Sequence, residues 1–438
     1  MDILKDSIAV VYRKFLAAAF GSALMMSIYS LVDAAVVGQY HGPAGVAAMA
    51  VIAPIWNVIF SLGLLAGIGG SVLYAVKRGA RSSIAPANRY FTVSLLAGLV
   101  LSAIVMAGLF LYTEPLLRLF GGKGELLDLS LRYMRAVQWG VPLFIFTNIL
   151  MAFLRNDGNP KLATLAVLSG GIFNVFGDYF FVFTCNMGIF GAGLATIIGE
   201  AIAILVMVSH FFHRRNTLRL EMPFVPVLFA QKIVVVGFSA FFIDLAMGIL
   251  TMLFNWQILH YMGTDELAVY GVIVMVSTFV QCCGYGIGQG AQPILSQNYG
   301  AGAFSRVGQT LRYSIWTAAV VSAVWIAALI SAPNAFVRLF MRPTEAVLSV
   351  APSIIRTYAL AFVFLPFNVF ATYYFQAILR PRTSFAVSLA RGLVLPGCLI
   401  LALPTLFCGA ALWWAAPIAE AMVAGGVVFA LVRARQKR

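Results

Sequence analysis

Twelve long apolar segments constrain this chain more than any other feature of its sequence. A helix needs about 20 mostly apolar residues to cross the roughly 30 Å hydrocarbon core of a bilayer. Hydrophobic residues make up 62% of the chain and charged residues only 10%, which leaves too little polar surface for a soluble fold. The chain is therefore predicted to be an all-α integral membrane protein with twelve transmembrane helices. We place the spans at residues 15–37, 47–74, 91–112, 133–154, 162–184, 189–212, 233–259, 267–293, 313–332, 353–378, 384–404 and 410–432.

Basic residues are distributed unevenly among the loops between these spans. An even number of spans puts both chain ends on one side of the membrane. Lys and Arg in the ends and in the loops of that side, where we count Arg155 and Arg391, outnumber those of the opposite loops by about three to one, which marks the cytoplasmic side. We therefore expect a multi-pass protein with both termini in the cytoplasm. The net charge of +14 then reflects topology, and no nucleic-acid partner is expected.

The two halves of the sequence resemble each other at a nearly constant offset. Six predicted spans separate equivalent points, so the halves have the same orientation and are related by a pseudo-twofold axis along the membrane normal. We expect two six-helix lobes, residues 1–220 and 221–438, with a cleft for a transported molecule between them. The matching pieces are residues 67–69 and 286–288, residues 118–120 and 338–340, and Asn148 and Asn368.

Acidic side chains within the predicted spans need a reason to be there, because each costs about 2.5 to 3.5 kcal/mol on insertion scales. The sequence places no Lys or Arg plainly in mid-membrane, and Glu420 has no evident partner. Spans whose charged side chains are all acidic favour the binding of cations within the membrane. The acids within the spans are Asp33, Asp178, Glu200, Asp244 and Glu420.

Several oxygen-bearing side chains fall at one depth in the first half. Asp33, Asp178 and Thr196 lie about 7 to 12 Å inside the outer boundary for a rise of about 1.5 Å per residue. The helical repeat puts Asn174 on the same face as Asp178, and Ala192 on the same face as Thr196. Carboxylates, an amide, a hydroxyl and a backbone carbonyl suit a small hard cation or a proton. The alternative is that these side chains only hydrogen-bond neighbouring helices.

Three stretches of the sequence resemble the bacterial branch of the multidrug and toxic compound extrusion (MATE) family. They are GIGQGAQPILSQNYGAG at 286–302, NVFGDYFFVF at 174–183 with GIFGAGLAT at 188–196, and VDAAVVG at 32–38. The similarity covers essentially the whole chain and implies a protein of the bacterial cytoplasmic (inner) membrane. It also implies a coupling-cation site in the N-terminal lobe. Carried over by motif, the site residues are Asp33, Asn174, Asp178, Ala192 and Thr196.

The chain departs from the family's pattern in two places. Members often carry a proline in the first half of helix 1, whose bending is linked to protonation and drug release. No proline precedes Pro43 here, and Gly21 is the candidate for flexibility in its place. Some relatives carry an acid pair on helices 7 and 10, whereas this chain has only Asp244 on helix 7. We therefore expect no ion site in the C-terminal lobe, and Asp244 is either a substrate contact or a structural residue.

The leading functional expectation is a secondary antiporter that exports amphipathic, cationic compounds in exchange for H⁺ or Na⁺. If the ion is Na⁺, Asp33 and Asp178 hold it. The alternatives are a flippase for a lipid-linked precursor, which needs a basic cleft, and a membrane enzyme, which needs a catalytic His/Asp or Asp–metal cluster. We expect no enzymatic activity, no cofactor beyond the coupling ion, and a monomer in the lipid bilayer. Further candidates for substrate contact or ion relay are Glu200, Asp244, Tyr29, Asn148 and Asn368.

Overall fold

The computed structural model describes residues 3–80, 84–214, 216–341 and 343–436, and these residues form helices joined by short turns. Two of the connecting segments are π-helical, Phe180–Thr184 and Ala390–Val394. In chain order the α-helices are α1 (Ile8–Gly79), α2 (Ile84–Leu119), α3 (Glu125–Asn156), α4 (Pro160–Tyr179), α5 (Ile189–Val208), α6 (Pro226–Tyr261), α7 (Thr264–Gly300), α8 (Phe304–Ser331), α9 (Pro333–Phe340), α10 (Glu345–Ala359), α11 (Leu365–Ala377), α12 (Pro381–Leu389), α13 (Leu395–Leu406) and α14 (Ala415–Gln436).

The predicted number of spans is confirmed. Within the described ranges, 12 helical segments are long and apolar enough to cross a membrane. The first two, Ile8–Gly42 and Ala44–Gly79, both belong to α1. The last three are each built from shorter helices placed end to end, so α10 and α11, for example, make one span from Glu345 to Ala377.

The break within α1 lies at Gly42, whose φ of 65° and ψ of −153° leave the helical region. Glycine adopts a positive φ at little cost because it has no Cβ atom. Gly42 is the one residue in α1 with non-helical backbone angles, so Gly21 lies inside an unbroken helix of 35 residues. The first span is therefore continuous in this structure, and the break comes at its end.

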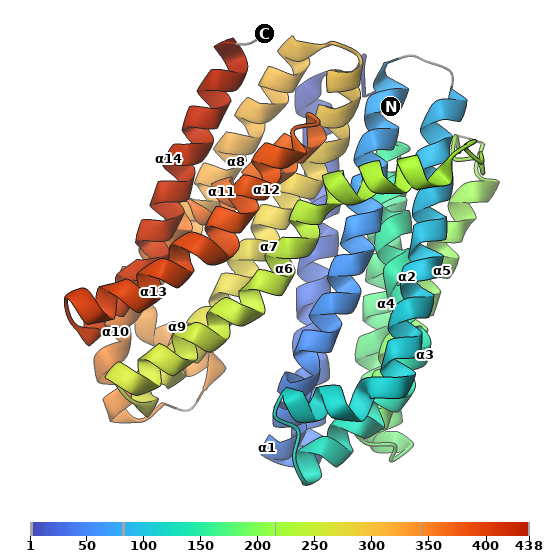
Figure 1. Ribbon diagram of the computed structural model, residues 1–438. Helices are drawn as coiled ribbons and strands as arrows, with labels where there is room; N and C mark the ends of the chain where they lie inside the picture. The colour runs from blue at the N-terminus through green and yellow to red at the C-terminus, as the bar shows by residue number, and fades with distance from the viewer. Residues whose placement is uncertain (1–2, 81–83, 215, 342, 437–438) are drawn as a thin grey trace.

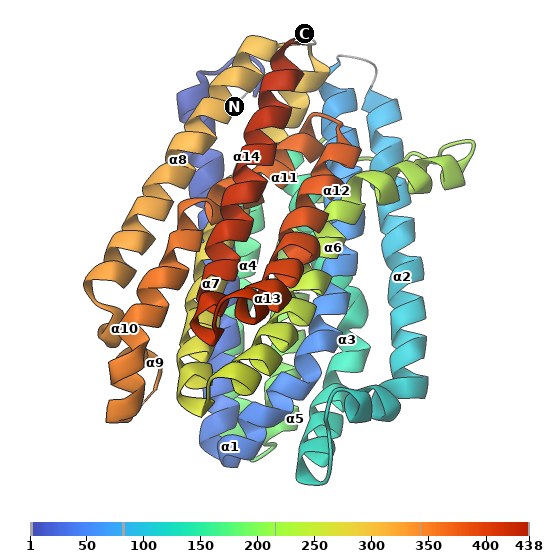
Figure 2. The same ribbon diagram turned by 60° about the vertical axis from the view of Figure 1, so that its left-hand side comes forward.

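The helices form two lobes, as the internal repeat predicts (Figure 1). Helices α1–α5 make the first lobe and α6–α14 the second. Both chain ends lie at the same end of the bundle, where the lobes meet, and the lobes diverge toward the opposite end. The second view shows α6 starting beside α2 and running down along the second lobe (Figure 2). The predicted boundary at residues 220 and 221 falls in the connection between Phe212 and Pro226.

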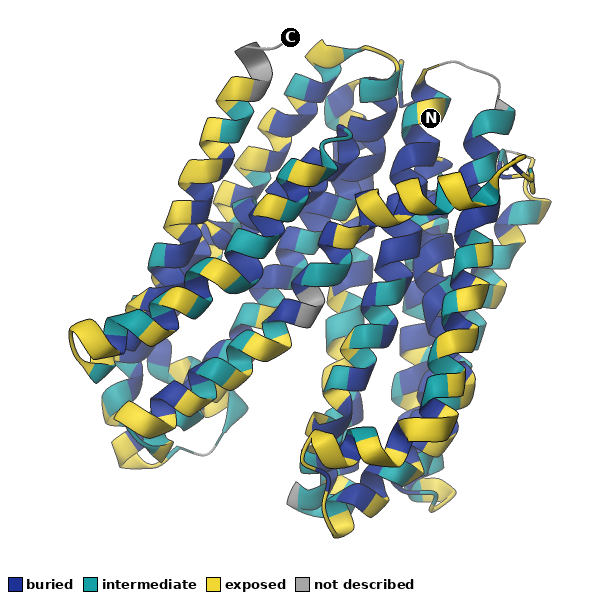
Figure 3. Ribbon diagram, in the orientation of Figure 1, coloured by how far each residue is buried: buried dark blue, intermediate teal, exposed yellow. Residues whose placement is uncertain are grey.

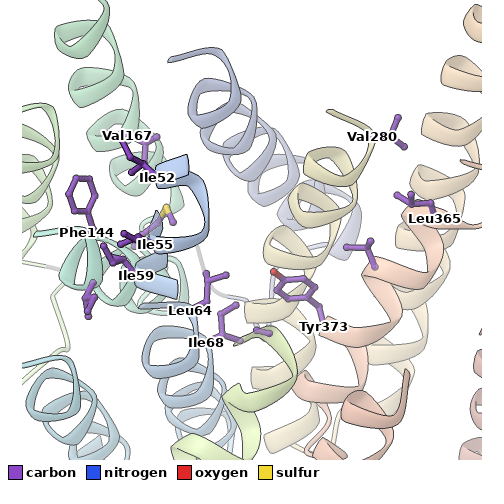
Figure 4. Packing of buried hydrophobic residues seen from close by; sticks show 14 of the residues in the cluster. Ile52, Ile55, Ile59, Leu64, Ile68, Phe144, Val167, Val280, Leu365 and Tyr373 are labelled. Atoms are coloured by element: carbon purple, nitrogen blue, oxygen red, sulfur yellow. The ribbon is translucent and has the colours of Figure 1, made fainter. Parts of the chain in front are cut away.

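Buried residues line the interior of each lobe, and exposed ones follow its outer surface (Figure 3). Large apolar side chains such as Leu111 and Leu205 are exposed on that outer surface, as expected where a helix faces lipid. Inside the first lobe, Ile55 and Ile59 pack near Phe144 (Figure 4). One cluster of buried apolar residues contains side chains of both lobes, such as Ile55 and Val280, although the lobes separate at one end.

The end of the bundle that carries the termini is closed by hydrogen bonds between the lobes. Asn156 of α3 donates to Gln292 of α7 over 3.0 Å, and Gln297 of α7 donates to the Asn156 carbonyl over 2.7 Å. Arg155 donates to Gln289 of α7 and is only 4% exposed. The prediction that Arg155 lies in a loop is therefore wrong, since the structure buries it in the last turn of α3.

A buried carboxylate, Asp157, ties the connection between the lobes to this closed end. Its Oδ1 pairs with the Arg78 guanidinium, and its Oδ2 lies 2.7 Å from Nε2 of His210. The Nδ1 atom of His210 accepts from Asn159, which leaves Nε2 as the nitrogen that carries the proton. The Thr217 backbone N–H also donates to Oδ2 over 3.0 Å. Because Thr217 belongs to the connecting segment, Asp157 holds that segment against the first lobe.

We expect the stability of the protein to fall in acid through Asp157. Burial raises the pKa of this carboxyl, but the His210 hydrogen bond, the Arg78 charge and the Thr217 hydrogen bonds outweigh burial and hold the pKa below its ordinary value of 3.8. A depressed pKa in the folded state gives stability that is complete above the unfolded pKa and lost as the pH falls through the folded pKa. The loss should therefore begin below about pH 4.

Asp157→Asn should lower the free energy of unfolding by about 2 to 3 kcal/mol at neutral pH, because hydrogen bonds to a charged group are lost. The measurement is the melting temperature of the detergent-purified protein from about pH 3 to pH 7. Asp128→Asn, at an exposed site on α3, is the matched control and should change little. Equal melting curves for the two variants would contradict the prediction.

Candidate functional site

The candidate site begins where α4 and α5 approach each other through two glycines. A Cβ atom on Gly170 would lie 2.4 Å from the Gly199 carbonyl oxygen, so no larger residue fits without moving a helix. Small residues let the backbones of membrane helices approach closely. One turn from this contact, Asn174 Nδ2 donates to Thr196 Oγ1 over 3.1 Å. The close packing therefore brings two of the predicted site residues together.

The remaining predicted residues of these two helices join the same cluster. Asn174 Nδ2 also lies 3.4 Å from Asp178 Oδ1, and the Thr196 hydroxyl donates to the Ala192 carbonyl over 3.0 Å. Asp178 is fully buried and Asn174 is nearly so. The structure thus places Asn174, Asp178, Ala192 and Thr196 side by side, in the arrangement that helical spacing predicts.

Asp33 reaches the cluster from α1. Its side chain is buried, and its Oδ2 accepts from the Tyr133 hydroxyl of α3 over 3.3 Å. The Asp33 and Asp178 carboxylates are near enough to interact electrostatically, and both act on Tyr133. Sequence reasoning missed Tyr133, because it lies near the start of a predicted span among other aromatic residues and carries no distinguishing signal. Helices α1, α3 and α4 therefore contribute side chains to the site together with α5.

A cavity of about 20 Å³ lies next to this cluster, which is room for one water molecule. Asn174 and Thr196 form part of its wall. Tyr29 of α1 and Glu200 of α5, both predicted as relay or substrate candidates, line it as well. The structure therefore places a third carboxyl group, Glu200, at the cavity that Asn174 and Thr196 of the cluster also line.

Among the described residues, the cluster and its neighbouring cavity hold four buried oxygens that have no hydrogen-bond partner. A buried acceptor without a partner is costly, so it calls for a proton, an ion or water. These oxygens belong to carboxylates and an amide, which are the donors that Na⁺ and a proton favour. The residues present therefore fit a small cation. The oxygens are Asp33 Oδ1, Asn174 Oδ1, Asp178 Oδ2 and Glu200 Oε2.

The other predicted candidates lie elsewhere. Asn148 donates to the Phe144 carbonyl and faces a small cavity between the lobes, beside Arg155. Asn368, its counterpart in the repeat, lies in the second lobe and donates to Glu420 Oε2 over 2.6 Å. The side chain of Asp244 lies outside the part of the chain that the structure describes.

The second lobe contains a buried ion pair that sequence reasoning missed. Arg391 was expected in a loop, and the spans were expected to hold acids alone, but Arg391 lies in the π-helical segment inside the span Pro381–Leu406. Its Nε lies 2.9 Å from Glu420 Oε1, and its Nη2 donates to Gln281 over 3.1 Å. Both predictions, of an interior without basic residues and of a partnerless Glu420, are therefore wrong. The position of Arg391 within the apolar run 384–404 was the available signal.

The fold and the site define a class: an integral membrane protein of twelve spans, with two lobes and a polar, acidic site buried within one of them. The MatE family model matches residues 18–180 and 240–400, one match in each half of the chain. The protein belongs to the multidrug and toxic compound extrusion (MATE) family of transporters.

Known relatives and solved structures agree with this assignment. The multidrug export protein MepA of Staphylococcus haemolyticus is 24% identical over 417 residues, which cover 95% of this chain and 91% of the relative. MepA of Staphylococcus aureus is 22% identical over 411 residues, covering 92% of this chain and 88% of the relative. A solved structure described as the outward-facing conformation of a multidrug resistance MATE family transporter superimposes with a TM-score of 0.91 at 22% identity, over 100% of this chain and 98% of the other. Another, of MATE in the straight conformation, has a TM-score of 0.90 at 21% identity and covers 100% and 98%.

Proposed function

We propose that this protein is a secondary antiporter that exports amphipathic, cationic compounds across a bacterial cytoplasmic membrane in exchange for H⁺ or Na⁺. The observation that carries the proposal is the cluster of buried oxygens in the first lobe, where two carboxylates lie together and neither forms an ion pair with a basic side chain of the described residues. The relatives named above, which are multidrug export proteins, support the class of substrate.

Each residue of the cluster has a role in this proposal. Asp33 and Asp178 take up the coupling cation, whether it is a proton or Na⁺. The oxygens of Asn174 and Thr196 complete its shell together with the Ala192 carbonyl oxygen, which lies at the same cluster because it accepts from the Thr196 hydroxyl. Tyr133 is a positioning residue, because its hydroxyl orients the Asp33 carboxylate.

Helix α3 connects the ion site to the closed end of the bundle. It carries Tyr133 at the site and Asn156 at the contact between the lobes. A helix transmits a displacement as a rigid element, so loading of the ion at Asp33 can bias the contact that Asn156 makes with α7. The lobes would then rock to expose the space between them to each side in turn.

The proposed orientation follows from the loop charges and the position of the termini. We place the closed end, with both termini, in the cytoplasm, so the lobes diverge toward the outside (Figure 1). The substrate would be released on that side. One chain contains both lobes, and we propose that it acts as a monomer.

No observation favours the flippase alternative. A lipid-linked precursor carries phosphates, which would need unpaired basic groups between the lobes. Arg391 is paired with Glu420. Arg155 donates to Gln289 across the closed end and its Nε and Nη2 have no hydrogen-bond partner among the described residues, but a single guanidinium does not make a basic cleft. The antiporter therefore remains the function that the geometry supports best.

Transport should favour lipophilic cations over anions of the same size. The purified protein is reconstituted in vesicles, and a ΔpH and a Na⁺ gradient are imposed independently. We expect a cationic dye to be exported under one of the two gradients and a matched anionic dye to stay at the level of empty vesicles, since Asp33, Asp178 and Glu200 form no ion pair with a basic side chain among the described residues. Export of the anionic dye alone would contradict the substrate class. No response to either gradient would contradict ion coupling.

A further inference from the structure

The internal repeat relates Glu200 in the first lobe to Glu420 in the second. The two residues are separated by the same number of positions as Asn148 and Asn368, and each is preceded two residues earlier by Ile and followed by Ala. The repeat therefore places one carboxyl group at the same point of each lobe. The surroundings of these two carboxyl groups differ.

In the first lobe the carboxyl group has open space beside it. Glu200 lines the cavity next to the ion site, and Gly170 and Gly171 of α4 form another part of the cavity wall. Glu200 Oε2 has no hydrogen-bond partner among the described residues. An acid in such a place can take up a proton or a cation.

In the second lobe the equivalent carboxyl group, that of Glu420, accepts hydrogen bonds at both of its oxygens. Glu420 Oε1 accepts from Arg391 Nε at 2.9 Å and Oε2 accepts from Asn368 Nδ2 at 2.6 Å. The side chains of Arg391 and Glu420 are only 8% and 10% exposed. Aligned by the same repeat, Arg391 falls at the position of Gly171, which lines the cavity of the first lobe. The second lobe therefore has a guanidinium on the residue whose counterpart in the first lobe has no side chain.

The second lobe also lacks the other groups of the ion site. The residue equivalent to Thr196 is Ala416, and the residues equivalent to Asn174 and Asp33 fall among apolar side chains. Of the oxygen donors in the first lobe, the second has kept the glutamate alone and has added a fixed positive charge.

We propose that Arg391 is a built-in counter-cation, which holds the charge of Glu420 at the second-lobe counterpart of the cavity beside the ion site and so restricts ion coupling to the first lobe. A guanidinium stays protonated in proteins and cannot leave, so Glu420 remains ionised throughout the transport cycle. Tyr358 of α10 is the other titratable group that interacts with Glu420 among the described residues. The part of this inference that concerns coupling rests on the proposed function, whereas the charge compensation does not.

Arg391→Met tests the inference, since Met keeps much of the length of the side chain and removes its charge. Glu420 would then lie buried without a countercharge, with Asn368 still donating to its Oε2, and it should become protonated. Infrared spectroscopy of the purified full-length protein detects a protonated carboxyl group by its C=O stretch. We expect Arg391→Met to gain such a band near neutral pH. The double variant Arg391→Met/Glu420→Gln should lose it, and Arg391→Lys, which keeps the charge, should resemble the wild type.

The possible outcomes separate charge compensation from a purely structural role. A folded Arg391→Met protein with no new carboxyl band at any pH overturns the inference. If Arg391→Met fails to fold while the double variant folds, the unpaired charge is the cause and the inference stands. If the double variant also fails to fold, Arg391 is needed for its shape, and the inference is overturned.

The coupling part has its own measurement in vesicles. The number of ions exchanged per substrate should be higher in Arg391→Met than in Arg391→Lys, because Glu420 then loads an additional ion. Equal ratios in the presence of the new carboxyl band overturn the coupling part alone. If the wild type shows no response to an ion gradient, the proposed function fails, while the infrared result still decides the role of Arg391.

Discussion

Replacing Asp178 by Asn is expected to abolish ion-coupled efflux while the protein still folds and inserts. The amide keeps the size of the side chain and can still hydrogen-bond Asn174, but it binds neither a proton nor Na⁺ as a carboxylate does. A loss of roughly 1.4 kcal/mol in ion affinity already lowers binding about tenfold. Because the group is fully buried beside Asp33, we expect a larger loss, with efflux falling to the level of empty vesicles.

The measurement is substrate efflux from vesicles under an imposed ion gradient, at matched protein content. Asp128→Asn is the control, because Asp128 is an exposed aspartate of the same lobe and should transport normally. Tyr133→Phe, which removes only the hydroxyl that orients Asp33, should reduce efflux less than Asp178→Asn. Near wild-type efflux of Asp178→Asn at normal expression would falsify the proposed ion site.

Substituting Gly79 or Gly300 by Ala should disrupt the closed end of the bundle. These glycines stand at the ends of α1 and α7, where the helices from the two lobes cross backbone to backbone. A Cβ on Gly79 would lie 1.9 Å from the Gln297 carbonyl oxygen, and one on Gly300 1.9 Å from the Val76 carbonyl oxygen. The helices would have to separate by about 1 Å, at a cost of about 1 to 3 kcal/mol for overpacking. Such a cost shifts a two-state equilibrium by about tenfold or more.

We therefore expect both variants to favour a conformation that is open at the end carrying the termini, and to lose most of their efflux. Spin labels at the exposed residues Lys161 and Arg312, one on each lobe, measure the separation of the lobes in a background without the native cysteines. Gly308→Ala is the matched control, because no atom lies within 4 Å of the added Cβ. Unchanged label distances in Gly79→Ala and Gly300→Ala would show that the closed end tolerates the added atoms.

Much of the candidate site could be predicted because it depends on local periodicity. Asn174 and Asp178 are four residues apart, and a helix brings such residues to one face wherever it lies in the molecule. The common depth of Asp33, Asp178 and Thr196 follows in the same way from the rise per residue and the ends of the spans. No knowledge of the packing was needed for these statements.

The groups that were missed depend on contacts between helices far apart in the sequence. Tyr133 becomes a site residue only because α3 packs beside α1 and brings its hydroxyl to Asp33. Arg391 was assigned to a loop, because the order of spans along the sequence does not show how deep a residue lies in a long helix. Glu420 was assigned no partner, because the same order does not show which residue of another helix it contacts. The number of basic residues in the loops indicates which side of the membrane each loop faces. A buried arginine such as Arg391 is then counted together with the true loop residues.

The sequence by itself determined that this protein lies in a membrane, how many spans it has, and that an internal repeat divides it into two lobes. Those properties follow from the length and apolarity of the segments, since a bilayer accepts only helices that satisfy their own backbone hydrogen bonds. The tertiary structure alone decided that the two lobes, similar in sequence, differ in charge. In the first lobe Glu200 lines a small cavity and no ion pair joins it to a basic side chain among the described residues, whereas in the second lobe Arg391 pairs with the equivalent Glu420. The order of residue types along the chain does not reveal this difference in charge. It depends on which side chains become neighbours when the helices pack together.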